Sequence, residues 1–591
     1  LPCDPSPPSS SRGRALYDMA FSHTGVLFLL LLSFLLLLLG NPASSDAPPS
    51  APVDPSTACN STLDPKFCKT VLPRRGSDNL YDYGRFSLAK SLSNARRFLN
   101  LVNRYLAGRS TLSSTAILAL QDCQLLSSLN IDFLTSAGAT LNYTDNLLDP
   151  QVEKVQTLLS ALLTNQQTCS DGLQATASAW SVKNGLSVPI SNSTKLYGIS
   201  LALFKKAWIP KKKYKRNGGR VPSRVLPHGR SLLFHEVNVG RNGELPLRMS
   251  APKRGLFERW SGRRLLQATD TVQVDDIVLV SQDGSGNYTT ISDAVNSAPS
   301  DLDGSTGYYL LYVAAGVYQE YVVISKHKKY LMMIGDGINQ TVITGNHNVV
   351  DGWTTFNSST FAVVGQGFVG INMTFQNTAG PAKHQAVAVR NGADLSTFYS
   401  CSFEGYQDTL YTHSMRQFYG ECDIYGTVDY IFGNAAVVFQ SCNVYSRLPL
   451  QGQTNTITAQ GRTDPNQNTG TSMQDCNFLA AADLAADNGP TITYLGRPWK
   501  LYSRTVIMQS FMDSLIDPAG WLPWNGDFAL DTLYYAEYNN SGPGAGVANR
   551  VTWPGYHVIG SSDAANFTVS SFILGDNWLP QAGVPYDSGL L

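Results

Sequence analysis

Residues 401–442 contain an internal repeat that restricts the fold more than any other part of the 591-residue chain. CSFEGYQDTLY (401–411) and CDIYGTVDYIF (422–432) align without a gap, with Cys first, Gly fifth, Asp eighth and an aromatic residue eleventh. Asp408 and Asp429 are therefore 21 residues apart in equivalent positions. A period of about 20 in Gly- and Asn-rich sequence with short β-branched and aromatic runs indicates a solenoid.

Equivalent positions in successive turns of a solenoid lie about 4.8 Å apart, the spacing of neighbouring strands. The repeat therefore predicts that Asp408 and Asp429 lie side by side on one face. Two carboxyl groups that close do not both ionise easily, so the pKa of one rises and the pair can act as an acid and a base. The alternative is that both residues only occupy turns, where Asp is common.

The sequence from residue 272 onward has the pattern of strands and turns. Short apolar stretches such as 308–318 and 436–442 alternate with Gly, Asn and Asp, and related phrases recur every 20 to 34 residues. Loops of different length leaving the turns of a solenoid explain this irregular spacing. We predict an all-β parallel β-helix rather than an antiparallel sandwich, which would not align one residue type in a column.

The region before residue 209 has a helical pattern instead. Apolar residues recur every three or four positions at 88–106 and 152–162, and 115–134 is a further helical candidate. This period predicts an all-α antiparallel bundle within residues 46–208.

The two parts of the chain differ in charge. Residues 1–266 contain 32 Lys and Arg against 16 Asp and Glu, whereas residues 267–591 contain 12 against 28. We therefore expect separate modules with a boundary near residue 266.

The segment 209–266 is basic and rich in Gly and Pro, so we expect it to be exposed and flexible. Proteases cut chain of this kind most readily. Its RRLL, from Arg263 to Leu266, predicts cleavage after about Leu266 by a subtilisin-like processing protease.

The first residues predict export from the cell. Met19 is followed by an apolar run at 26–39 and then by small residues, the pattern of a signal peptide. The run is short for a membrane span. We interpret 1–18 as upstream translated sequence and 19–45 as the signal peptide, with an uncleaved membrane anchor as the alternative. Behind such a signal we do not expect nucleic acid as a partner.

Glycosylation and cysteine usage fit a secreted protein. Nine Asn-X-Ser/Thr sequons occur, at Asn60, Asn142, Asn192, Asn287, Asn339, Asn357, Asn372, Asn539 and Asn566. The nine Cys show no C-x-x-C spacing, which favours disulfides over zinc. We find no serine-hydrolase elbow, zincin or Walker motif, and we expect neither a metal nor a cofactor.

Four long motifs lie in the β-rich part of the chain: GYQDTLYTH (405–413), GTVDYIFGNAAVVFQ (426–440), ITAQGR (457–462) and YLGRPWKLYSRTV (494–506). Together they resemble plant pectin methylesterases. The resemblance covers about residues 275–580. It implies a right-handed parallel β-helix that hydrolyses the C6 methyl esters of homogalacturonan, the methylated polymer of pectin, and releases methanol. Tyr430, where Phe is commoner, departs from the family pattern, and we expect no consequence.

The resemblance also implies the roles of individual residues. Asp429 is the nucleophile that forms an acyl-enzyme, and Asp408 is the proton donor that later activates water. Gln407 and Gln385 stabilise the oxyanion. Arg497 holds Asp429 ionised and oriented.

Substrate contacts are implied for Gln385, Arg497, Trp499 and Thr355. Arg497 and Trp499 are two residues apart, which places them on one side of a strand. Trp499 offers a flat apolar surface to a sugar ring. In an unrelated sequence, a surface Arg packed on a core Trp would be the better interpretation. The register at Thr355 is open because Thr354 precedes it.

The cysteines of the helical part resemble those of the plant invertase and pectin methylesterase inhibitor family, through TACNSTLDPKFC, QDC and QQTC. That family is a four-helix bundle, and its pattern implies Cys59–Cys68 and Cys123–Cys169 disulfides. Such a pro-region either restrains the enzyme until cleavage or only assists folding. Separate inhibitor proteins of the same family are candidate partners.

The pectin methylesterase pattern favours a Cys422–Cys442 disulfide, since these residues occupy equivalent positions in neighbouring turns. The pairing of Cys401 and Cys476 stays open. We expect an extracellular, cell-wall enzyme. The alternative functions are another β-helix pectinase, a lyase or a polygalacturonase, or a purely inhibitory role of the bundle.

Overall fold

The computed structural model describes residues 48–591 except 75–77, 109, 111, 177–179, 210–246, 264, 266–271 and 488. The expected upstream translated sequence (1–18) and signal peptide (19–45) lie outside the described residues. Among the described helices, none is both long and apolar enough to cross a membrane. Contacts group residues 52–591 into one compact unit.

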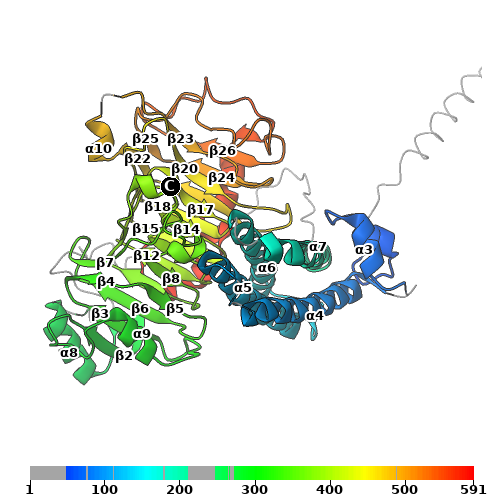
Figure 1. Ribbon diagram of the computed structural model, residues 1–591, viewed down its shortest axis with the longest axis horizontal. Helices are drawn as coiled ribbons and strands as arrows, with labels where there is room; N and C mark the ends of the chain where they lie inside the picture. Colours follow the sequence, from blue (N-terminus) through cyan, green and yellow to red (C-terminus); the bar gives the residue numbers. More distant parts are fainter. Residues whose placement is uncertain are drawn as a thin grey trace, which may run out of the picture. The chain divides into compact units, whose positions relative to one another are not determined.

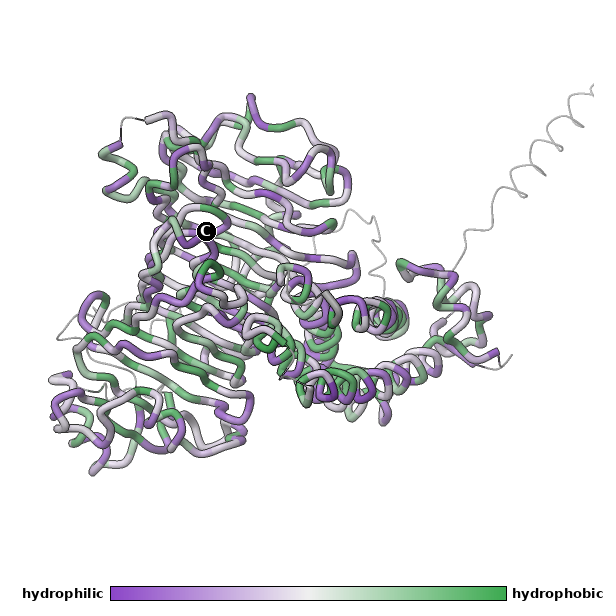
Figure 2. Tube along the Cα trace, in the orientation of Figure 1, coloured by the Kyte–Doolittle hydropathy of each residue, from purple (hydrophilic) through white to green (hydrophobic). Residues whose placement is uncertain are grey.

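Four long helices form the predicted bundle (Figure 1). They are α4 (Leu80–Ala107), α5 (Ser114–Leu141), α6 (Asp149–Ala175) and α7 (Trp180–Trp208). Each packs on the next, and α4 also packs on α7, which closes the bundle. Green apolar and purple polar stretches alternate along these helices in Figure 2, as expected for helices that bury one face.

Local sequence sets the ends of these helices. Asn79 and Asp82 form a capping box at the start of α4. Two short helices precede it, α2 (Pro55–Cys59) and α3 (Pro65–Val71), each starting with Pro after a capping Asp. The Cys59–Cys68 disulfide joins α2 to α3, and Cys123–Cys169 joins α5 to α6. Both implied bundle disulfides are therefore present.

The rest of the chain is the predicted parallel β-helix, built from three sheets in which every pair of strands is parallel. One sheet contains β1 (Leu247–Arg248), β2 (Val272–Val280), β3 (Tyr308–Val313), β6 (Leu331–Gly335), β9 (Val369–Ile371), β12 (Ser396–Tyr399), β15 (Arg416–Gly420), β18 (Ala436–Gln440), β21 (Gly470–Gln474), β24 (Arg504–Met508), β26 (Tyr534–Tyr538) and β27 (Tyr556–Val558). The second contains β4 (Gly316–Gln319), β7 (Thr341–Gly345), β10 (Thr374–Asn377), β13 (Ser402–Glu404), β16 (Asp423–Gly426), β19 (Asn443–Ser446), β22 (Asn477–Ala480) and β25 (Phe511–Met512). The third contains β5 (Val322–Ile324), β8 (Phe361–Val363), β11 (Val389–Asn391), β14 (Leu410–Thr412), β17 (Val428–Gly433), β20 (Asn455–Gln460) and β23 (Thr493–Gly496).

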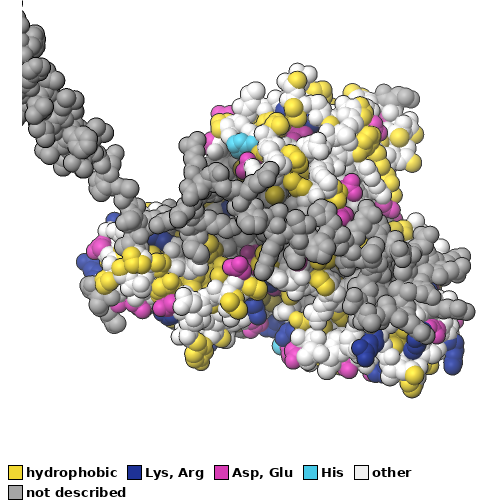
Figure 3. All heavy atoms as spheres, turned by 180° about the vertical axis from the view of Figure 1, so that it is seen from behind, with side chains coloured by type: hydrophobic (Ala, Val, Ile, Leu, Met, Phe, Trp, Pro, Cys, Tyr) yellow, Lys and Arg dark blue, Asp and Glu magenta, His cyan; other side chains and the backbone are white. Residues whose placement is uncertain are grey.

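Short helices accompany the strands. They are α9 (Ile291–Ser297), η3 (Phe356–Ser358), η4 (Pro381–Lys383), α10 (Ala482–Ala485), α11 (Ser561–Ala564), η5 (Ala565–Phe567), α12 (Val569–Phe572), η6 (Gly575–Asn577) and α13 (Leu579–Ala582). α9 packs on β2, β3 and β5 at the first turns of the β-helix. On the face shown in Figure 3, acidic and basic side chains are interspersed over the described part of the surface.

Identical or similar side chains stack inside the β-helix from turn to turn. The rings of Phe398 and Tyr419 are 5.2 Å apart, and those of Tyr419 and Phe439 are 4.8 Å apart, both stacked.

Tyr430, which stands where Phe is commoner in the family, is fully buried. Its hydroxyl lies 3.1 Å from Oγ of Ser446, so the departure from Phe leaves no unpaired polar group.

The column that begins each repeat consists of free thiols, so the predicted Cys422–Cys442 disulfide is wrong. Strand register places Cys401, Cys422, Cys442 and Cys476 in four successive turns, and all four are buried and unbonded. Each thiol instead lies near backbone carbonyl oxygens; Sγ of Cys422, for example, is 3.2 Å from the oxygen of Gly420. Equivalent positions in neighbouring turns suggested the disulfide, but strand register alone does not determine that two stacked thiols are bonded.

Part of the segment expected to be a flexible linker is folded. β1 pairs with β2, and α8 (Ala251–Ser261) follows directly. Arg263 is 2% exposed and donates a 3.0 Å hydrogen bond to the backbone oxygen of Asp336, and Leu265 is buried. The expectation of exposed chain is therefore wrong at these two residues of RRLL, while Arg264 and Leu266 lie outside the described residues.

Candidate active site

Strand register brings the two repeated Asp residues together, as the repeat predicted. β14 pairs with β17 through Leu410 and Ile431, so Asp408 and Asp429 occupy equivalent places in adjacent turns. They are 7% and 5% exposed. Both have a positive φ, 62° and 52°, a conformation that Asp adopts more readily than most residues.

A break in strand pairing positions Asp429. The register between β17 and β20 shifts between Val428 and Ile431, and irregularities of this kind re-aim side chains beside active sites. Asp408 lies just before β14, and its N–H donates a 3.1 Å hydrogen bond to the oxygen of Val428. Both carboxyl groups line the same cavity as a result.

Arg497 holds the carboxylate of Asp429 by two parallel hydrogen bonds. Its Nε donates to Oδ1 and its Nη2 to Oδ2, each at 2.8 Å. This two-pronged pairing fixes orientation as well as charge. The guanidinium also lies 4.4 Å from the ring centroid of Trp524.

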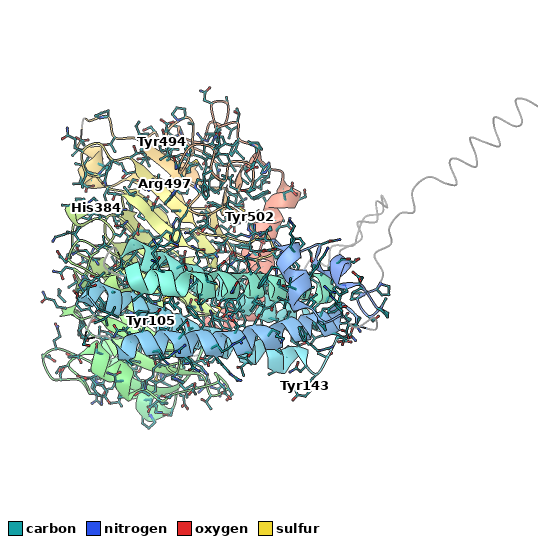
Figure 4. The ribbon with its side chains drawn as sticks, turned by 45° about the vertical axis from the view of Figure 1, so that its right-hand side comes forward. Tyr105, Tyr143, His384, Tyr494, Arg497 and Tyr502 are labelled. Atoms are coloured by element: carbon teal, nitrogen blue, oxygen red, sulfur yellow. A yellow bond between two sulfur atoms is a disulfide. The ribbon has the colours of Figure 1, made fainter. Side chains whose placement is uncertain are left out.

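The place of Arg497 on the backbone differs from the prediction. β23 ends at Gly496, so Arg497 and Trp499 lie in the segment after the strand rather than on one side of it. Figure 4 shows Arg497 beside the yellow strands, close to Tyr494 of β23.

Thr456 is a further contact of Asp429 that sequence reasoning missed. Its hydroxyl donates a 2.7 Å hydrogen bond to Oδ1 of Asp429 and accepts one of 2.9 Å from the Asp429 N–H. One hydroxyl thus fixes both the backbone and the side chain of this residue. Thr456 stands one position before the recognised ITAQGR motif, and a lone Thr in a strand carries no chemical signal.

The surroundings of Asp408 favour its protonated form. Burial raises its pKa well above the usual range, the nearby Asp429 carboxylate raises it further, and Arg497 lowers it in part. The pair therefore has the asymmetry needed for an acid and a nucleophile.

The other predicted residues line the same cavity, which has a volume of about 450 Å³. Gln385, Gln407, Thr355 and Trp499 are all on its wall. Among the described residues, neither glutamine side-chain amide has a hydrogen-bond partner, so both are available to an oxyanion. Thr354 also borders the cavity, but its hydroxyl donates to the bundle residue Asp122 at 2.6 Å, which leaves Thr355 as the candidate substrate contact.

Residues of the helical bundle form part of the cavity wall. Thr168 and Asp171 of α6 lie in it, together with Asp408 and Asp429. Oγ1 of Thr168 is 3.0 Å from Nε2 of His413 and 3.4 Å from the hydroxyl of Tyr411. Nζ of Lys500 donates a 2.9 Å hydrogen bond to Oδ2 of Asp171.

The contact between bundle and β-helix continues beyond the cavity. Asp122 of α5 accepts hydrogen bonds from Thr354 and from the side-chain amide of Asn357, and burial raises its pKa to about 7. Nδ2 of Asn468 donates to Glu153 at 2.6 Å and to Thr157 at 2.9 Å. Asp122, Thr354 and Thr157 are buried, and Asn357, Asn468 and Glu153 are half-buried, so polar side chains of both parts meet across this contact.

A β-helix with an arginine-bound carboxylate next to a carboxyl group of raised pKa has the groups that an aspartate-based hydrolase needs. The pectinesterase family matches residues 277–576, and the plant invertase/pectin methylesterase inhibitor family matches residues 54–203. This chain belongs to the pectinesterase family and carries an inhibitor-family domain before the catalytic one.

Individual relatives share both domains. A probable pectinesterase/pectinesterase inhibitor of Arabidopsis thaliana is 58% identical over 91% of this chain and 94% of its own length. Pectinesterase 2 of Citrus sinensis is 44% identical over 91% of this chain and 96% of its own. The structure of pectin methylesterase from carrot is 54% identical, with a TM-score of 0.53, and covers 55% of this chain and 100% of the carrot chain. The whole of the solved carrot chain thus aligns with about half of this chain.

Proposed function

We propose that the β-helix hydrolyses C6 methyl esters of homogalacturonan through an aspartyl acyl-enzyme. The observation that carries this proposal is the pairing of Asp429 with Arg497 beside Asp408, whose pKa is raised by burial and by its neighbour. One carboxylate is held ready for attack, and the other carboxyl group keeps a proton to give.

In the first half-reaction, a carboxylate oxygen of Asp429 attacks the ester carbonyl carbon. The side-chain amides of Gln385 and Gln407 donate hydrogen bonds to the oxygen that becomes negative. As the tetrahedral intermediate collapses, the bond to the methoxy oxygen breaks, and Asp408 transfers its proton to that oxygen, giving methanol. The acyl group remains on Asp429 as an anhydride.

In the second half-reaction, Asp408 is a carboxylate and acts as the base. It takes a proton from water, whose oxygen attacks the acyl carbonyl. Collapse of this intermediate releases the free acid of the sugar and restores the carboxylate of Asp429. Arg497 and Thr456 keep that carboxylate in place for the next cycle.

The reaction is distinguished from the other pectinase chemistries by its products. Residues 267–591, incubated with methylated pectin, should release methanol while the polymer keeps its length. A lyase would give unsaturated, shortened products, and a polygalacturonase would give shortened products without methanol. Either of these results would reject the esterase assignment.

We propose that the bundle restrains the enzyme until it is removed. The support is the position of α6, whose Thr168 and Asp171 occupy the wall of the catalytic cavity. Release by a subtilisin-like protease at RRLL requires local opening, because Arg263 and Leu265 are buried. We place the mature enzyme in the cell wall, where pectin is its substrate and separate inhibitor proteins of the same family are candidate partners.

This restraint is tested by comparing methanol release from the full chain before and after cleavage. Cleavage followed by loss of the bundle should raise the rate at least about tenfold, since the polymer and α6 compete for one cavity. Equal rates for the uncleaved chain and residues 267–591 would reject the restraint and leave the bundle a folding role.

A further inference from the structure

The processing sequence RRLL is folded back against helix α8 in the uncleaved chain. α8 packs on β2 (Figure 1), and Phe257 is fully buried, with its ring centroid 5.5 Å from that of Tyr312. The helix ends at Gly262, whose φ of 65° turns the chain. Arg263 and Leu265 follow at once and are both buried.

Two side chains of α8 hold the backbone of Leu265. The Leu265 N–H donates a 3.1 Å hydrogen bond to Oε1 of Glu258, and the Leu265 carbonyl oxygen accepts one of 2.9 Å from Nη2 of Arg254. Nε of Arg254 donates to the same Oε1 of Glu258 at 3.0 Å, across one helical turn. Arg254, Glu258 and Leu265 are therefore joined in a closed ring of three hydrogen bonds.

The first residue of RRLL is held separately. Nη2 of Arg263 donates a 3.0 Å hydrogen bond to the backbone oxygen of Asp336 in the β-helix. The N–H of Arg263 donates one of 3.1 Å to Oγ of Ser261, at the end of α8. The first and third residues of the processing sequence are thus both fixed in the folded chain.

A protease needs the backbone groups that α8 occupies. An extended peptide is bound as a strand largely through its backbone N–H and C=O groups, and a protease that cuts after Leu266 must bind Leu265 in this way. In the folded chain, Glu258 and Arg254 take both of these groups, and the Leu265 side chain is buried. Cleavage therefore requires that Leu265 first separate from α8.

We propose that Arg254 and Glu258 form a latch on the processing sequence, and that opening of this latch limits the rate at which the restrained chain becomes free enzyme. The inference rests on the proposed cleavage at RRLL and not on the esterase chemistry. Hydrogen bonds to charged groups are the stronger ones in proteins, so the closed latch is favoured. When opening and closing are faster than cutting, the rate of cleavage follows the fraction of chains in which the latch is open.

The test measures the rate at which a subtilisin-like protease, added at low concentration, cuts the full chain at RRLL. The masses of the two fragments identify the cut. Glu258→Ala should be cut about tenfold faster than the unmodified chain, since it loses the acceptor for Leu265 and the partner of Arg254. Glu258→Gln keeps an acceptor oxygen and should be cut within about threefold of the unmodified rate.

A double variant tests whether the latch acts as a unit. Arg254→Met should also accelerate cleavage. In the chain that carries both Arg254→Met and Glu258→Ala, the acceleration should be smaller than the product of the two single effects, because each substitution breaks the same ring of hydrogen bonds. Single effects that multiply would overturn the latch as a unit.

Lys253→Met is the matched control on the same helix. Nζ of Lys253 pairs at 3.0 Å with Asp276 of β2, so this ion pair lies outside the latch. The two side chains are 33% and 52% exposed, and a pair this exposed contributes little to stability. The variant should be cut within about twofold of the unmodified rate. Short peptides spanning 250–272 with each substitution should all be cut at one rate, because they lack the fold that closes the latch.

The outcomes separate the latch from the processing site. A Glu258→Ala chain cut at the unmodified rate, or peptides whose rates differ as the chains do, would overturn the latch and leave RRLL as the processing site. Equal acceleration in Lys253→Met would also overturn it, because the effect would then belong to general loosening of α8. Failure to cut both chain and peptide at RRLL would overturn the processing site and the latch together, while the esterase assignment would stand on methanol release.

Discussion

Asp408 and Asp429 are held in a backbone conformation that non-Gly residues seldom adopt. Such conformations cost of order 1–3 kcal/mol each and persist only where the surroundings impose them. Here the N–H of Asp408 is bound by Val428, and the N–H of Asp429 is bound by Thr456. At the scale of single residues, the site is therefore a strained pair fixed by hydrogen bonds from the next turn.

Thr456→Val should lower kcat of the β-helix about 10- to 100-fold with little change in KM. The substitution removes a hydrogen bond to a charged group, worth about 1.5–3 kcal/mol, but leaves the volume and the substrate contacts. Thr456→Ser keeps the hydroxyl and should recover most of the activity. Steady-state kinetics on methylated pectin measure this, and a Val variant with unchanged kcat would contradict the role of Thr456.

Arg497 should influence the pH at which activity is lost on the alkaline side, because it changes the pKa of Asp408. The reaction needs protonated Asp408, so the rate falls as pH rises through its raised pKa. Because the Arg497 guanidinium lowers that pKa in part, Arg497→Met should reduce kcat at least about 100-fold and move the alkaline limb to higher pH.

Arg497→Lys provides the control for this prediction, because it keeps the charge and loses the two-pronged bond. Its kcat should fall, while its alkaline limb should stay near that of the unmodified β-helix. The pH dependence of kcat for the three proteins measures the effect. A limb that moves to lower pH in Arg497→Met would contradict the assignment of Asp408 as the acid.

At the scale of elements, successive turns of the β-helix place equivalent residues in columns, and different columns have different roles. The column at the start of each turn, Cys401, Cys422, Cys442 and Cys476, packs as buried thiols. The column at the eighth position contains Asp408 and Asp429, the proposed catalytic pair. Stacking alone therefore places residues together without deciding whether they bond, ionise or only pack.

Counting thiols tests the cysteine column. Denatured but unreduced protein, treated with an alkylating reagent and digested, should carry four labels within residues 52–591, on the four cysteines of this column. A Cys422–Cys442 disulfide would leave two labels there. Native protein should react slowly, because all four thiols are buried.

Features that follow from the repeat period could be predicted from the sequence. Interactions of a side chain that has several possible partners could not. The 21-residue step predicted the adjacency of Asp408 and Asp429 because stacking in a β-helix follows directly from the repeat. The thiol column obeys the same step, yet the disulfide is absent. Thr456 was not predicted, because its position opposite a pairing irregularity leaves no mark in the sequence.

At the scale of the whole molecule, the bundle and the β-helix share an interface of buried and half-buried polar side chains, which includes the cavity of Asp408 and Asp429. Asp122 makes this interface sensitive to pH. Burial raises the pKa of its carboxyl group to about 7, although Thr354 and Arg390 act in the opposite direction. A carboxyl group whose pKa is raised by docking stabilises the docked state below its ordinary pKa. That contribution is lost as pH rises through about 7.

The restraint by the bundle should therefore weaken as pH rises from about 4 to about 7, between the ordinary and the raised pKa of Asp122. The measurement is methanol release by the uncleaved chain divided by that of residues 267–591 at each pH, which cancels the titration of Asp408. The ratio should rise with pH for the unmodified chain and stay flatter for Asp122→Asn. A ratio that falls with pH in the unmodified chain would contradict this role of Asp122.

The central claim is that Asp429 is the nucleophile of a pectin methylesterase. The direct measurement is methanol release from methylated pectin by residues 267–591 and by their Asp429→Ala variant, with folding of both checked by circular dichroism. We predict release without shortening of the polymer, and a loss of at least about 10³-fold in the variant. A folded Asp429→Ala variant with full activity would contradict the account.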